Sequence, residues 1–80
     1  MNDDNIVRRI GELADEEHAL ERSHAGHGLS EGDKDRLKGL EVALDQCWDL
    51  LRQRRARRSA GKDPEGATLR PPSTVEHYQQ

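Results

Sequence analysis

Large apolar side chains are scarce in this sequence of 80 residues. It has no phenylalanine, one tryptophan and one tyrosine, and only 31% of its residues are hydrophobic. So small an apolar content excludes a large enzyme with a deep pocket of its own. No run approaches the ~20 apolar residues that cross a bilayer, so we expect no membrane-spanning segment. The first residues are polar and acidic, so no signal peptide is predicted.

Cysteine and positive charge are also limited. Cys47 is the single cysteine, which leaves no intrachain disulfide and predicts a cytoplasmic protein. Charged residues make up 36% of the chain, and the formal net charge is −3. A net-acidic chain lacks the broad positive field of a general nucleic-acid binder. Five of its ten arginines instead fall in a single run between residues 52 and 58.

Two stretches have helical periodicity. In the first, apolar residues recur at spacings of about three, four and seven, which predicts a helix over about 4–23 that is capped by Asp3 or Asp4. Three glycines then interrupt the pattern, so residues 24–32 are a predicted loop, and Ser30 or Asp33 caps the next helix. The second helix spans about 33–60 and stops at Gly61 and Pro64. Its apolar positions form a heptad seam of Leu37, Leu40, Leu44, Cys47 and Leu51.

The two seams match when the helices run antiparallel. The predicted pairs are Leu20 with Leu37, Leu13 with Leu44, Ile10 with Cys47, and Ile6 with Leu51. In the same register Arg54 faces Asp3, and Leu40 faces Glu17, a carboxylate that either sets the register or reaches water. The predicted fold of residues 1–60 is therefore an all-α, antiparallel two-helix hairpin.

A lone hairpin buries only one stripe of each helix and is marginally stable. Spare apolar surface on the second helix favours a homodimer in the form of a four-helix bundle. The predicted oligomer interface consists of Ala43, Cys47, Trp48 and Leu50. The alternative is that the tail, residues 61–80, folds back over Trp48. We expect this tail to be extended and to contain prolines, with a short terminal turn around Val75 and Tyr78.

Candidate chemistry is sparse. Glu21 and His24 have the spacing of a bundle metal motif but lie outside the apolar seam, and His24 with His27 lacks the further ligands that zinc requires. His18 lies on the outer face, and no histidine approaches Cys47 in the register. Gly26 and Gly28 follow no strand, so they do not form a nucleotide-binding loop. We therefore predict no catalytic residue, cofactor or metal site.

The arginine run is compatible with helix-end electrostatics, with contacts to a protein partner and with phosphate binding. No aromatic residues interleave it for base stacking. The predicted partner contacts are Arg54, Arg55, Arg57 and Arg58.

Residues 44–56, LDQCWDLLRQRRA in one-letter code, resemble the core of a small actinobacterial family, domain-of-unknown-function family 2630. Further matches are Leu40-Glu41, Glu16-Glu17-His18, Gly61 with Asp63-Pro64, and Val75-Glu76 with Tyr78 and Gln80. The resemblance implies a stand-alone cytosolic bacterial protein, and the family carries no assigned activity or ligand. Our functional hypothesis is a non-enzymatic helical adaptor or regulator that acts as a homo-oligomer with an unidentified protein partner. The alternative is a nucleic-acid-associated protein.

Overall fold

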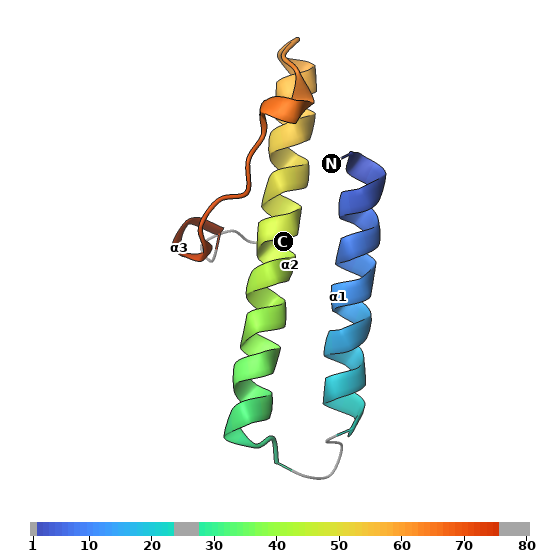
Figure 1. Ribbon diagram of the computed structural model, residues 1–80, viewed down its shortest axis with the longest axis vertical. Coiled ribbons are helices and arrows are strands. Elements are labelled where there is room, and N and C mark those ends of the chain that lie inside the picture. The colour runs from blue at the N-terminus through green and yellow to red at the C-terminus, as the bar shows by residue number, and fades with distance from the viewer. Residues whose placement is uncertain (1, 24–27, 76–80) are drawn as a thin grey trace.

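The computed structural model describes residues 2–23 and 28–75. Helix α1 (Asp3–Ser23) and helix α2 (Glu31–Ser59) lie side by side and antiparallel (Figure 1). After them come a 3-10 turn, η1 (Pro64–Gly66), and a short helix, α3 (Pro72–Val75). The predicted all-α hairpin is confirmed. Neither α1 nor α2, nor any other helix of the described residues, is long and apolar enough to cross a membrane.

Helix α1 is capped by Asn2. The side-chain Oδ1 of Asn2 accepts a hydrogen bond from the backbone N–H of Asn5 at 2.8 Å, and its carbonyl accepts one from Ile6. The predicted cap, Asp3 or Asp4, is therefore wrong. Both residues lie inside the first turn, where their negative charge favours the helix N-terminus. The carboxylate of Asp3 is thereby left to bond with α2.

Helix α2 begins at Glu31, two residues before the predicted start. Ser30 is its cap, since Ser30 Oγ accepts from the N–H of Asp33 at 3.1 Å. Gly32 therefore belongs to the first helical turn and not to the loop. Residues 24–27 of the predicted loop lie outside the described residues.

Gly61 ends α2 with a φ of +75°, a left-handed conformation that glycine adopts without strain. The N–H groups of Gly61 and Lys62 donate to the carbonyls of Arg58 and Arg57 at 3.0 and 2.8 Å. This is the Schellman pattern of a helix C-terminus. It satisfies the last carbonyls of α2 and turns the chain back along the helix.

The core centres on Ile6, Leu50 and Leu51, as the predicted pairing of Ile6 with Leu51 requires. Further side chains that pack on this cluster are Ile10, Cys47, Trp48 and Ala67. Two predicted seam pairs are exchanged. Leu40 is buried and lines a hollow with Leu13, whereas Leu44, the predicted partner of Leu13, lines a different hollow with Glu17. Side chains of packed helices interdigitate, so a residue of α1 packs between two residues of α2 and does not face a single partner.

The tail packs along α2, and α3 lies on the side of α2 away from α1 (Figure 1). Val75 in α3 is completely buried, and Ala67 packs on the Ile6–Leu51 cluster. Helix α3 ends at Val75, where a turn was expected, and Tyr78 lies outside the described residues. The tail up to Val75 is therefore part of the folded unit.

Candidate interaction site

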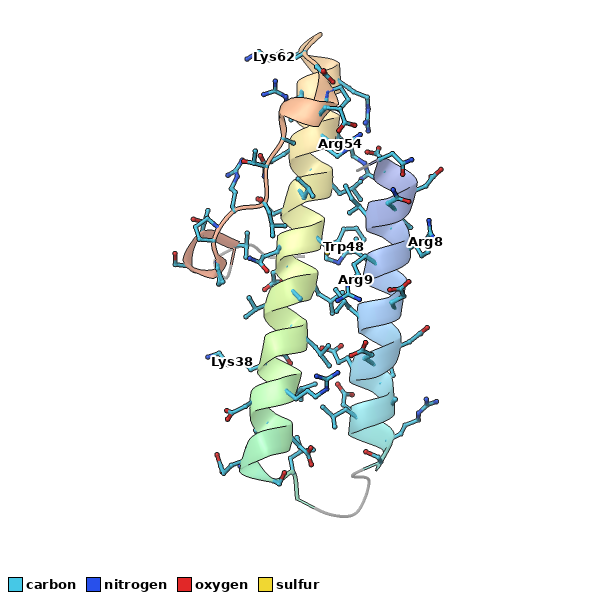
Figure 2. All side chains as sticks on the ribbon, in the orientation of Figure 1. Arg8, Arg9, Lys38, Trp48, Arg54 and Lys62 are labelled. Atoms are coloured by element: carbon cyan, nitrogen blue, oxygen red, sulfur yellow. The ribbon has the colours of Figure 1, made fainter. Side chains whose placement is uncertain are left out.

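Arg54 and Arg58 tie the C-terminal part of α2 to the start of α1. The guanidinium of Arg54 is buried and donates to Asp3 Oδ1 at 2.7 Å and to Glu65 Oε1 at 3.1 Å (Figure 2). Arg58 donates to both carboxylate oxygens of Asp3, at 3.2 and 2.5 Å. Hydrogen bonds from Arg58, and then from Arg54, lower the pKa of Asp3 to about 2. The predicted pairing of Arg54 with Asp3 is present.

Arg57 holds the tail. Its Nε donates to the carbonyl oxygen of Asp63 at 2.6 Å. Its guanidinium lies against Gly66, where a Cβ would come within 2.2 Å of it. Arg57 and Arg58, two of the predicted partner contacts, therefore bond within the chain, because the chain turns back at Gly61 and Asp3 accepts from a second arginine. Arg55 is exposed.

A polar stripe along α2 binds the backbone of the tail. The amide of Gln53 donates to the carbonyl of Thr68 at 2.7 Å, and the amide of Gln46 donates to that of Arg70 at 3.1 Å. Between them, Asp49 is only 1% exposed and accepts from Gln53 Nε2 at 2.8 Å. Arg70 Nε lies 3.4 Å from the same carboxylate.

Sequence reasoning missed this polar stripe. The stripe could have been predicted from the spacing of its residues. Helical spacing places Gln46, Asp49, Gln53 and Arg57 on one side of the helix. A polar stripe on an amphipathic helix ordinarily faces water, so only the docked tail reveals its role.

The name Trp48 face is used here for five apolar side chains that helical spacing places along one side of each helix: Val7, Ile10 and Ala14 of α1, and Leu44 and Trp48 of α2. Val7 is 52% exposed, and the other four side chains are partly buried. Trp48 is drawn between α2 and α1 in Figure 2. At about 100° per residue, it lies some 140–160° around α2 from Gln46 and Gln53. The described part of the tail therefore docks on another side of α2, and residues 76–80 lie outside the description.

An acidic hollow adjoins the Trp48 face toward the loop end of the hairpin. Its lining residues are Glu17 of α1 with Glu41, Leu44 and Asp45 of α2. Glu17 is thus partly buried at the surface beside two other acids, and does not lie in an apolar layer opposite Leu40. An acidic hollow built from two helices favours a cationic side chain over an anionic one.

The other predicted interface residues lie closer to the core. Leu50 is 9% exposed within the Ile6–Leu51 cluster, on which Ala67 of the tail also packs, so it is buried within the chain. Ala43 is partly buried and lines the hollow with Leu13 and Leu40. Cys47 packs on the core cluster, and burial raises the pKa of its thiol. A raised pKa keeps the thiol protonated near neutral pH, when it is a poor nucleophile.

His18 and Glu21 are exposed on α1, and His24 and His27 lie outside the described residues. In the ranges 2–23 and 28–75, no group of three or more His, Cys, Asp or Glu side chains is placed to hold a metal ion.

Comparison with known proteins places the chain in a family. A family model described as "Protein of unknown function (DUF2630)" matches residues 2–80, and the chain belongs to this family. Uncharacterized proteins of Mycobacterium bovis and Mycobacterium tuberculosis are 46% identical to it over 77 residues, which cover 95% of this chain and 88% of theirs. No solved structure matches the chain.

Proposed function

We propose that this protein is a small, non-enzymatic interaction protein of the cytoplasm, an adaptor or regulator that acts as a homo-oligomer. The observation that carries the proposal is the Trp48 face. It presents a half-exposed valine and a partly buried tryptophan on the side of the hairpin that the described tail leaves uncovered. Tryptophan is enriched at the centres of protein interfaces.

The dimensions of the molecule are compatible with a stable interface. Its principal extents are 50 × 24 × 17 Å. A standard interface buries roughly 800 Å² on each partner. The hairpin offers a surface of that order along its length, and an apolar centre with charged surroundings is the usual composition of such a contact.

Nucleic-acid binding is the less supported alternative. Arg54, Arg57 and Arg58 direct their donors to Asp3, Glu65 and backbone carbonyls of the tail. Donors committed within the chain contribute less to phosphate binding. We expect no retention of duplex or single-stranded DNA by the folded protein at 50 mM salt. Binding that weakens steeply with added salt would favour the alternative.

The proposal is tested by light scattering on a size-exclusion peak over a concentration series. We expect a mass of at least twice 9.1 kDa for the wild type. Val7→Glu on the Trp48 face should shift the protein toward the monomer with its helix content unchanged. Ala19→Glu is the matched control, because Ala19 is exposed on the outer side of α1. A wild-type monomer at high micromolar concentration would contradict the homo-oligomer.

A further inference from the structure

We infer that the occupant of the Trp48 face is a second copy of this chain, docked about a twofold axis beside Trp48 with the two α2 helices antiparallel. This inference rests on the proposed function, and it adds the identity of the partner and the orientation. The order of charges along α2 favours this orientation.

Acidic and basic residues flank Trp48 symmetrically. Glu41 lies seven residues before it, and Arg55 lies seven residues after it. Seven residues are nearly two turns of helix, so both lie within about 20° of Trp48 and about 10 Å to either side along the axis. Both are exposed. Asp45 and Arg52, three residues before and four after, repeat the same order of charges closer to the tryptophan.

A twofold axis beside Trp48 reverses the direction of the second helix. It therefore places Glu41 opposite the partner's Arg55, and Arg55 opposite the partner's Glu41. A parallel arrangement would instead oppose like charges at both ends, which is unfavourable. The antiparallel dimer joins opposite charges twice, and the twofold relation makes the surface self-complementary, as a closed dimer requires.

The acidic hollow supplies the place where the partner's arginine docks. Glu17 of α1 and Glu41 of α2 line it together, so the receiving site depends on the folded hairpin and not on α2 alone. Between the two charged ends lie Val7, Ile10 and Trp48, which would bury apolar surface at the centre. Charged pairs at the rim around an apolar centre are the typical anatomy of a specific interface.

The test is a charge-reversal cycle in the full chain. In the Glu41→Arg variant, two arginines face each other at each end of the dimer. In the Arg55→Glu variant, two glutamates face each other there. Each single variant should raise the dimer dissociation constant by about tenfold or more, as like charges do when they replace close opposite pairs. An equimolar mixture of the two variants restores both pairs, so its dimer dissociation constant should lie within about threefold of the wild-type value.

The double variant Glu41→Arg/Arg55→Glu should also dimerise, because opposite charges again meet. Asp35→Arg, at an exposed position of α2, is the control and should leave the dimer unchanged.

Sedimentation equilibrium measures the dissociation constants, and circular dichroism shows that each variant is folded. A wild-type dimer that is indifferent to both reversals would overturn the arrangement while the proposed homo-oligomer stands. Failure of the double variant to recover would overturn the antiparallel orientation. A wild type that is monomeric, but dimerises once residues 76–80 are removed, would overturn the inference in favour of the chain's own end as the occupant.

Discussion

Toward α1, helix α2 presents buried leucines, whereas toward the tail it presents Gln46, Asp49 and Gln53. On the first side, Leu40 and Leu51 are 6% and 1% exposed and are packed in the hairpin. On the second, the side-chain amides donate to carbonyl oxygens of the tail. Apolar packing is non-directional and supplies most of the folding free energy, while hydrogen bonds to a backbone fix its position. The helix thus uses one side to stabilise the hairpin and another to position the tail.

Removing a buried leucine on the side of α2 that faces α1 should greatly lower the free energy of unfolding. Leu51→Ala removes a side chain buried against Ile6, and a large-to-small change in a core costs about 2–5 kcal/mol of unfolding free energy. Leu69→Ala makes the same change at a residue that is 59% exposed, and should cost about 0.5 kcal/mol or less. Urea unfolding at a fixed protein concentration measures both. Similar losses at the two positions would contradict the placement of the core.

Breaking the polar side should have a smaller and more local effect. Asp49→Ala removes a buried carboxylate that accepts from Gln53 and pairs with Arg70, and a hydrogen bond to a charged group contributes about 1.5–3 kcal/mol. Hydrogen exchange should quicken mainly at the amides of Thr74 and Val75, which bond to the carbonyl of Pro71. Asp35→Ala, at an exposed position of the same helix, is the control. Equal quickening throughout α1 would mean that Asp49 supports the whole hairpin.

The same division explains what could be predicted from sequence. Apolar periodicity around Ile6 and Leu51 is a local signal. It is sufficient to predict two antiparallel helices and the pairing of Arg54 with Asp3. The cap of α1 was missed because Asn2, Asp3 and Asp4 are all good capping residues, and the choice between them depends on Asp3 bonding to α2. The role of Asp49 was missed because a polar residue on a helix is ambiguous until the segment that covers it is known.

At the end of the hairpin where α1 begins, ion pairs join α1 to α2. The pKa of Asp3 is lowered from its ordinary 3.8 to about 2 by the hydrogen bonds from Arg58 and Arg54. The carboxylate therefore adds stability that is fully present above about pH 4 and is lost as the pH falls toward 2. Asp3→Asn should remove this part of the acid sensitivity, so the variant should lose less stability than the wild type between pH 5 and pH 2.

Urea midpoints measured across that pH range provide the test, and Asp4→Asn, the same loss of charge at the next residue, is the control. Near neutral pH, Asp3→Asn should lower the free energy of unfolding less than Leu51→Ala or Asp49→Ala does. Asp3 lies at the surface, and salt screens its ion pairs. Added salt should shrink the difference between wild type and Asp3→Asn, whereas it should not shrink the effect of Leu51→Ala, which arises from packing. If the stability lost in Asp3→Asn is instead the same at high salt, the buried Arg54 depends on this carboxylate to satisfy its charge. The hairpin end would then resemble the polar side of α2 more than an exposed ion pair.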